Sequence, residues 1–152
     1  MKEGDLVSNF ILKDENGNNF ELYENLDTNV LLVFYPKDDT QVCSTQLTDY
    51  NENLDDFIRN GIKVVGISTD SVESHFSFCK KLNLNFPLLA DTDRKVSKAF
   101  DAINFLGMNK RLLVMIGKDK KVIWSDSTLP ITYFNTHEIL AKVDFLNRKE
   151  MT

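Results

Sequence analysis

The chain has 152 residues, of which 42% are hydrophobic and 27% charged, proportions that are typical of an ordinary globular protein with one domain, here residues 1–152. A formal net charge of −5 and scattered Lys and Arg residues provide no basic surface for a nucleic acid, so we exclude DNA and RNA binding. The first residues contain neither a membrane-spanning stretch nor the apolar core of a signal peptide, so we expect a cytoplasmic protein that does not enter the membrane.

The first predicted element is a β-hairpin. Two short runs that contain apolar residues, Phe10–Lys13 and Asn19–Leu22, flank the dipeptide Asn16-Gly17. Asn-Gly between two such runs is a strong signal for a tight turn between antiparallel strands. We therefore expect the chain to begin with a small antiparallel element.

A buried strand followed by a helix comes next. Val30–Tyr35 is apolar throughout, as expected for a central strand that is covered on both faces, and Pro36 ends it because proline has no N–H to donate. From about Val42 the sequence predicts a helix, which Asn60-Gly61 terminates. The apolar positions at helical spacing are Leu47, Tyr50, Leu54, Phe57 and Ile58. Cys43 is therefore expected in the first turn of this helix.

The same strand and helix pattern then repeats. Ile62–Ile67 predicts a second buried strand, and about Val72–Leu82 a second helix whose N-cap is Asp70 or Ser71. A strand, a helix and a further strand in this order form a βαβ unit, in which the two strands run parallel.

The second half of the chain is predicted to contain shorter elements and a final helix. In chain order they are a strand at Phe86–Asp91, a helix at Asp93–Phe100, a strand at Leu112–Ile116 that Arg111 opens, a strand at Val122–Trp124 after the turn Gly117–Lys120, and a helix at about Thr136–Leu146. The chain shows no internal repeat or linker. This order predicts an α/β protein with a mixed central sheet flanked by helices, and the thioredoxin-like fold fits it.

Cys43 is the candidate reactive residue. A helix N-terminus offers backbone N–H groups without helical partners and the positive end of the helix dipole, and both favour a thiolate over a thiol. Taken alone, Cys43 would be interpreted as a small buried hydrophobic residue at a helix start. Two cysteines in a reducing compartment argue against a structural disulfide framework and leave catalysis, redox sensing and core packing open.

The residues around Cys43 resemble a known active site. Pro36, Thr40 and Cys43 have the spacing Pro-x3-Thr-x2-Cys of the peroxiredoxin signature, and Phe34–Thr40 as a whole resembles the bacterioferritin comigratory protein (PrxQ) branch of that family. The resemblance, which covers nearly the whole chain, implies that the Cys43 thiolate attacks a hydroperoxide. It also implies that Pro36 shields the thiolate from water, and that the Thr40 hydroxyl accepts from the peroxide while donating to the thiolate.

The family also uses an arginine from a later strand, and Arg111 matches its position. A permanent positive charge with several fixed donors stabilises a thiolate and the charge that develops on a departing oxygen. The alternative is a surface charge at a strand end. Leu113 and Val114 stand where relatives usually have a small polar residue and Phe, which leaves the placement of the arginine open. Gln46 is either an orienting residue or an exposed glutamine.

Cys79 is the candidate resolving cysteine. It recurs with Val72, Phe76 and Leu82 at helical spacing, which predicts that it lies on the apolar face of its helix, and it could be a core residue only. The resemblance implies that some members of the branch carry the resolving cysteine on this helix. A Cys43–Cys79 disulfide would require local unwinding, because its two Cα atoms must lie within about 7 Å. If Cys79 stays buried, an external thiol must resolve the sulfenic acid.

The remaining polar residues receive less prominent interpretations. His75 and His137 are expected to be solvated, and Asp38, Asp39 and Asp70 to be solvated loop residues rather than metal ligands. The apolar loop Phe105–Met108 either lines the peroxide entrance or a partner surface, or is a buried loop that anchors the arginine strand.

The resulting prediction is a thiol-dependent peroxidase without a metal or other cofactor. It reduces hydrogen peroxide and organic hydroperoxides, is recycled by a thioredoxin- or glutaredoxin-like reductant, and is a monomer. The alternative is a redox-sensing or interaction module with little peroxide turnover.

Overall fold

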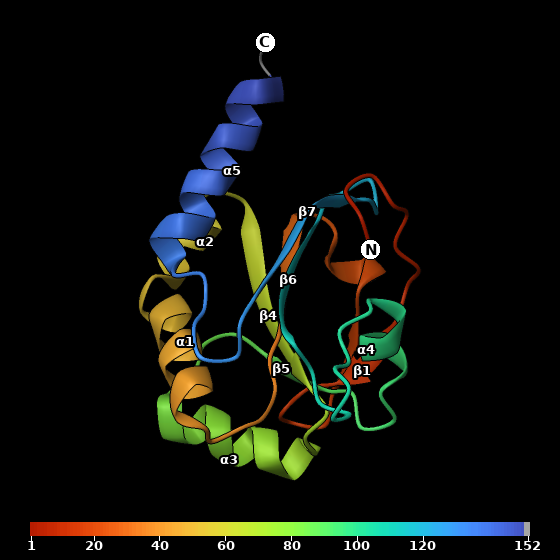
Figure 1. Ribbon diagram of the computed structural model, residues 1–152, viewed down its shortest axis with the longest axis vertical. Coiled ribbons are helices and arrows are strands. Elements are labelled where there is room, and N and C mark those ends of the chain that lie inside the picture. The colour runs from red at the N-terminus through yellow and green to blue at the C-terminus, as the bar shows by residue number, and fades with distance from the viewer. Residues whose placement is uncertain (151–152) are drawn as a thin grey trace.

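The computed structural model describes residues 1–150, the last of them by its backbone alone, and shows a seven-stranded mixed sheet with helices on both faces (Figure 1). The strands are β1 (Ile11–Lys13), β2 (Asn19–Glu21), β3 (Asn29–Phe34), β4 (Ile62–Ser68), β5 (Leu88–Ala90), β6 (Arg111–Ile116) and β7 (Val122–Thr128). The helices are α1 (Gln41–Glu52), α2 (Leu54–Arg59), α3 (Val72–Leu82), α4 (Lys95–Ala99) and α5 (Thr136–Glu150), with a 3-10 turn at Tyr23–Asn25. The strand order is β2-β1-β5-β4-β3-β6-β7.

The pairing of the strands confirms the predicted α/β class, the thioredoxin-like fold and the N-terminal hairpin. β3, β4 and β5 are parallel, because α1 with α2 and then α3 cross over between them. β6 runs antiparallel to β3, β7 runs antiparallel to β6, and the hairpin β1-β2 adds to β5 in the antiparallel sense. The start of β6 therefore lies beside the end of β3.

The two faces of the sheet carry separate apolar cores, which explains why the central strands are apolar throughout. In β3, Leu31 and Val33 pack under α1, α2, α3 and α5, whereas Val30 and Leu32 pack against the N-terminal segment and α4. Figure 1 shows the same division, with α1, α2, α3 and α5 on one side of the sheet and α4 with the N-terminal segment on the other. Cys43 and Cys79 both belong to the core beneath the four helices.

The single helix predicted after Cys43 is wrong, because two helices occupy this segment. α1 ends at Glu52 and α2 begins at Leu54, and the backbone of Asn53 between them leaves the helical region with φ −111° and ψ 19°. The Asn53 side chain donates to the backbone and side-chain oxygens of Asp49 at 2.8 and 3.0 Å. An asparagine that bonds to nearby backbone in this way competes with continued helix.

Several element ends also differ from the prediction. β7 continues to Thr128 and α5 to Glu150, while β5 and α4 are shorter than predicted and the 3-10 turn was not foreseen. Of the two residues proposed as the N-cap of α3, the structure selects Ser71, whose hydroxyl accepts from the N–H of Ser74 at 3.1 Å. Within residues 1–150, no helix combines the length and the apolar character needed to cross a membrane.

Candidate active site

Cys43 lies in the first turn of α1 and is completely buried. Thr40, in extended conformation, is the N-cap, and the first helical hydrogen bond runs from Ser44 N to the Thr40 carbonyl at 2.8 Å. The N–H of Cys43 therefore precedes the helical ladder and remains available at the end of the helix. A buried thiolate in this position needs positive partners, because burial disfavours the charged form.

Arg111 provides such a partner from a position 68 residues further along the chain. It is the first residue of β6 and only 5% exposed. Its Nη1 donates to the Cys43 Sγ at 3.1 Å and to the Gln46 Oε1 at 3.0 Å, and its Nε donates to the Pro130 carbonyl at 2.8 Å. Three contacts, two with α1 and one with the loop after β7, therefore hold the guanidinium beside the sulfur.

Gln46 is buried, and its contacts orient the arginine. Its Oε1 accepts from Arg111, and its Nε2 donates to the Tyr50 hydroxyl at 3.1 Å. That hydroxyl in turn donates to the Phe134 carbonyl at 2.6 Å. Burial raises the pKa of Tyr50 well above its usual value, so the hydroxyl remains a neutral donor. Of the two interpretations of Gln46, these contacts favour the orienting one.

Leu113 and Val114, where the sequence departs from the usual family pattern, do not displace Arg111. Both are buried, and they sit opposite Val33 and Leu32 in the register between β6 and β3. Leu113 packs in the core beneath α1, α2, α3 and α5, and Val114 packs in the core on the opposite face of the sheet. The polar environment of Arg111 comes instead from α1 and from the loop after β7.

Thr40 and Pro36 lie on the loop that joins β3 to α1, and both are half-buried. The Thr40 hydroxyl donates to the Lys37 carbonyl at 3.0 Å, rather than to the thiol as expected. Since a hydroxyl has one hydrogen and two lone pairs, its oxygen can still accept a hydrogen bond from a bound peroxide.

His75 is buried, and the prediction that it is solvated is wrong. The side chain is 0% exposed, whereas His137 at the start of α5 is exposed as expected. His75 Nδ1 lies 2.7 Å from Asp38 Oδ2, and its Nε2 lies 2.9 Å from the Leu89 carbonyl. His75, Phe78, Cys79 and Leu82 also recur at helical spacing, and that pattern could have identified the inner face of α3.

Asp38 likewise differs from the solvated loop residue expected. It is 5% exposed, while Asp39 next to it points outward and pairs with Lys81. Asp38, Asp70 and His75 bring one potential ligand atom each within 4.8 Å of one another. Each of these groups is already hydrogen-bonded inside the protein, so the cluster is an internal network.

Cys79 is also buried, at 9% exposed, on the inner face of α3. Phe76, which was predicted to share that face, is 51% exposed. Burial, followed by the carboxylates of Glu15 and Asp38, raises the pKa of the Cys79 thiol to about 12. Cys79 and Glu15 both line a pocket of about 400 Å³ between α3 and the β1-β2 turn.

Both cysteines are free thiols, and they approach the core from different places. α3 packs on β5, while Cys43 contacts Arg111 of β6. β4 and β3 lie between those two strands in the sheet. A disulfide between Cys43 and Cys79 therefore requires part of α1, part of α3, or both to leave the arrangement described here.

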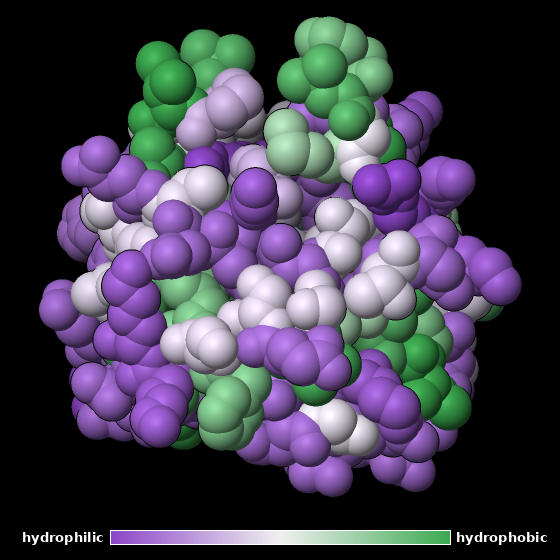
Figure 2. Space-filling model, turned by 90° about the horizontal axis from the view of Figure 1, so that it is seen from below, coloured by the Kyte–Doolittle hydropathy of each residue, from purple (hydrophilic) through white to green (hydrophobic). Residues whose placement is uncertain are grey.

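The loop Phe105–Met108 is not the buried loop that was one of its two interpretations. Phe105 is 95% and Leu106 66% exposed. The loop after β7, whose Pro130 carbonyl binds Arg111, also exposes Leu129 and Ile131. Seen from below, the molecule shows two apolar protrusions at one edge with polar surface between them (Figure 2).

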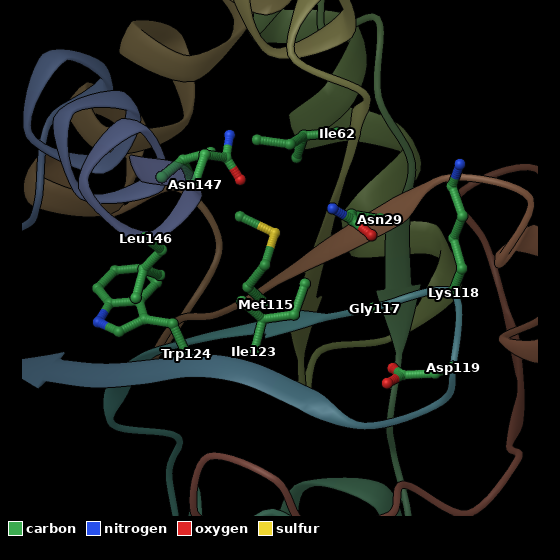
Figure 3. A pocket seen from close by; sticks show the side chains of 11 residues that line it. Asn29, Ile62, Met115, Gly117, Lys118, Asp119, Ile123, Trp124, Leu146 and Asn147 are labelled. Carbon is green, nitrogen blue, oxygen red and sulfur yellow. The ribbon is translucent and has the colours of Figure 1, made fainter. Parts of the chain in front are cut away.

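The pocket in Figure 3 lies at the other end of the sheet. It has a volume of about 340 Å³, and Asn29, Gly117 and Trp124 are among its lining residues. Asn29 begins β3 and Gly117 follows the end of β6, so the length of both strands separates this pocket from Cys43 and Arg111. It takes no part in the thiol site.

The chain is similar to known proteins in its sequence and its fold. Residues 4–125 match the model of the AhpC/TSA family. A Mycobacterium tuberculosis protein named for the peroxiredoxins is 34% identical over 135 residues, which cover 89% of this chain and 86% of that protein. Peroxiredoxin Bcp of Escherichia coli is 38% identical over 100 residues, which cover 66% of this chain and 64% of that protein.

A solved structure extends the likeness over the whole fold. The crystal structure of Xylella fastidiosa PrxQ has a TM-score of 0.83 and 29% sequence identity, and the match covers 99% of this chain and 96% of that one. Together with the match to residues 4–125, this places the chain in the AhpC/TSA family, as a peroxiredoxin of the Bcp (PrxQ) branch.

Proposed function

We propose that residues 1–152 form a single catalytic domain in which Cys43 reduces hydroperoxides, with Arg111, Thr40 and Pro36 forming the peroxide site. The observation that carries this proposal is the 3.1 Å contact between Arg111 Nη1 and Cys43 Sγ in a fully buried position. A fixed cation beside a buried sulfur favours the thiolate, which is the nucleophile. Thiol peroxidase activity is the activity of the family to which the chain belongs.

The first step is an attack of the Cys43 thiolate on one oxygen of the peroxide. The S–O bond forms as the O–O bond breaks, and the departing oxygen takes up a proton to leave as water or alcohol. Negative charge grows on that oxygen during the step. Arg111 and the free N–H of Cys43 are donors at the place where this charge develops, and the Thr40 oxygen can accept from the peroxide O–H.

The second step returns the Cys43 sulfenic acid to a thiol. We propose that the Cys79 thiol condenses with it, so that an S–S bond forms and the sulfenic hydroxyl leaves as water with the thiol proton. A thioredoxin-type dithiol then reduces the disulfide. The burial of Cys79 supports a slow second step, because α3 has to open first.

We also propose that the protein is a monomer and works in the cytoplasm. Free thiols that must be re-reduced after each turnover suit a reducing compartment. Analytical ultracentrifugation of the reduced and the oxidised protein tests the monomer, and a concentration-dependent dimer in either state would contradict it.

The decisive experiment mixes reduced wild type, Cys43→Ser and Cys79→Ser with one equivalent of hydrogen peroxide, followed by stopped flow and intact mass. We expect wild type to lose two hydrogen atoms, Cys79→Ser to gain one oxygen at Cys43, and Cys43→Ser to remain unchanged. Rapid sulfenic acid in wild type without a disulfide would assign the second step to an external thiol.

A second experiment, with excess peroxide and a reductant, separates the peroxidase from a redox sensor. A peroxidase consumes peroxide over many turnovers when thioredoxin, its reductase and NADPH are added. A protein that reacts once and is not recycled by these components would contradict the proposal, and so would oxidation of Cys43 no faster than that of a free thiol.

A further inference from the structure

A buried polar cluster joins the loop before Cys43 to the helix that carries Cys79. Asp38 lies between Pro36 and Thr40 on the loop, and His75 lies in the first turn of α3. Both side chains are buried, and His75 Nδ1 is 2.7 Å from Asp38 Oδ2. No step of the proposed reaction uses either residue.

The hydrogen bonds determine where the protons of this pair lie. The Leu89 carbonyl, 2.9 Å from His75 Nε2, can only accept, so Nε2 must carry a hydrogen. Two acceptors cannot approach to 2.7 Å, so a second proton lies between His75 Nδ1 and Asp38 Oδ2. With that proton on His75, the contact is a buried, charge-assisted hydrogen bond, which is one of the stronger polar interactions in proteins.

The rest of the cluster supports a carboxylate at Asp38. Its Oδ1 accepts from the Tyr35 hydroxyl at 2.6 Å, and its Oδ2 accepts from the Ser74 hydroxyl at 2.8 Å. Burial, and then the charge of Asp38, raises the pKa of Tyr35 well above its usual value, so Tyr35 stays a donor. The backbone N–H of Asp38 is held as well, by Asp70 Oδ2 at 2.8 Å.

The position of this pair connects the two steps of the reaction. Asp38 is two residues from Pro36 and two from Thr40, so its anchoring fixes the loop of residues 36–40, which we call the peroxide loop. His75 precedes Cys79 by four residues, which is about one helical turn, so the same bond fastens the part of α3 that must open for Cys79 to move.

We propose that the Asp38–His75 pair is a latch: while closed it positions the peroxide loop for attack by Cys43, and it must break before Cys79 can reach the sulfenic acid. This inference rests on the proposed function. Both are positioning residues, since neither touches the reacting atoms. The latch thus favours the first step and slows the second, in which the Cys43 sulfenic acid and the Cys79 thiol form a disulfide and release water.

Two substitutions of His75 test the latch as a matched pair. The His75→Asn variant keeps an N–H near the place of Nδ1, facing Asp38, and the His75→Gln variant keeps one near Nε2, facing Leu89. Both are neutral and of similar polarity. His137→Asn on the exposed surface of α5 is the control for the loss of a histidine.

Two rates are measured for each variant. Sulfenic acid formation is followed in a Cys79→Ser background, and disulfide formation is followed by intact mass after a peroxide pulse with Cys79 present. We expect His75→Gln to slow the first and to accelerate the second, each by about tenfold, because a charge-assisted hydrogen bond is lost. His75→Asn should lie between His75→Gln and wild type, and His137→Asn should match wild type.

Hydrogen exchange gives a readout that does not depend on activity. The amide of His75 donates to the Ser71 carbonyl at 3.0 Å and reports opening of the first turn of α3. We expect this amide to exchange faster in His75→Gln than in His75→Asn. If His75→Gln does not fold, Ser74→Ala removes one bond to the same carboxylate from a half-buried position and should shift both rates in the same directions, by about threefold.

Different results would contradict the latch and the peroxidase function. The latch is overturned if both rates stay within about twofold of wild type, if both fall together, or if His75→Asn and His75→Gln behave alike. It is also overturned if wild type oxidises Cys43 rapidly but never forms the disulfide, a result that leaves the peroxidase standing. The proposed function itself is overturned by different results: a wild type whose Cys43 reacts no faster than a free thiol, or one that the thioredoxin system does not recycle.

Discussion

Nη1 of Arg111 lies 3.1 Å from Sγ of Cys43, although 68 residues separate them in the sequence. β6 runs antiparallel to β3, and Leu112 pairs with Phe34, so the first residue of β6 reaches the place where β3 has ended and α1 begins. The sheet therefore delivers a permanent positive charge to the N-terminus of α1. Because the arginine is held by three hydrogen bonds, its position depends little on its own flexibility.

Arg111→Lys should slow the peroxide step by about 10²- to 10³-fold, because an ammonium cannot bind the sulfur, Gln46 and the Pro130 carbonyl from one rigid fork. Stopped-flow oxidation of Cys43 with hydrogen peroxide measures the change. The same substitution at Arg59, which pairs with Asp56 on the surface, is the control and should leave the rate as in wild type. Equal rates for the two variants would contradict the role of Arg111.

Gln46→Leu should destabilise the protein by about 1–3 kcal/mol and slow Cys43 oxidation by about tenfold. The substitution leaves one Arg111 N–H without its acceptor and the Tyr50 hydroxyl without its donor inside the core. Urea unfolding and stopped flow measure the two effects. Gln41→Leu, at an exposed position of the same helix, should change the free energy of unfolding by less than about 0.5 kcal/mol.

Thr40→Val should separate activity from stability. Although Thr40 is the N-cap of α1, its side chain makes no capping hydrogen bond and donates instead to the Lys37 carbonyl. We therefore expect a loss of stability of only about 1 kcal/mol, together with a loss of about tenfold or more in the peroxide step. Thr40→Ser keeps the hydroxyl and should restore most of the rate. A Thr40→Val variant as fast as wild type would remove Thr40 from the site.

Alkylation of Cys79 should require strongly alkaline solution while the protein is folded. In a Cys43→Ser background, iodoacetamide should react with the thiol at a rate that still rises near pH 11, because burial and the nearby carboxylates raise its pKa to about 12. In guanidinium chloride the rate should level off near the ordinary thiol pKa of about 8.5. A folded profile that matches the unfolded one would contradict the protection of Cys79.

Glu15→Gln tests the electrostatic part of this effect. The Glu15 carboxylate raises the pKa of Cys79 second only to burial, so its removal should lower that pKa in part. Glu3→Gln, on the exposed N-terminal segment, is the control. The linkage to stability follows the same direction: the folded state keeps the proton longer than the unfolded state, so the contribution of Cys79 is full below its unfolded pKa and is lost as pH rises towards about 12.

The loop between β3 and α1 is the part of the candidate site whose backbone the sequence predicted best. Pro36, Thr40 and Cys43 lie within eight consecutive residues, and each acts on backbone that is close in sequence: proline ends the strand, and the next turn begins the helix. For the same reason the Asn16-Gly17 turn and the strands of the parallel unit were predicted correctly. Their signals are local periodicity and turn chemistry.

The break at Asn53 and the burial of His75 were missed for a different reason. The helical spacing of the apolar residues continues through Asn53, but the hydrogen bond from its side chain to the Asp49 carbonyl favours an end of the helix there. His75 is polar, and a single polar residue in a helix is usually solvated. Asp38 and the Leu89 carbonyl, which come from two other segments, form the hydrogen bonds that offset the free-energy cost of removing the imidazole from water.

The sequence by itself therefore determined the family, the order of strands and helices, and the position of Cys43 at a helix start, because these depend on residues that are neighbours along the chain. The tertiary structure alone decided that Arg111 is held by Gln46, that Asp38 in the loop before α1 contacts His75 of α3, and that Cys79 is buried. These relations join segments tens of residues apart. The distances between these segments are set by the order of the strands and the packing of the helices, and these form only when the whole core packs together.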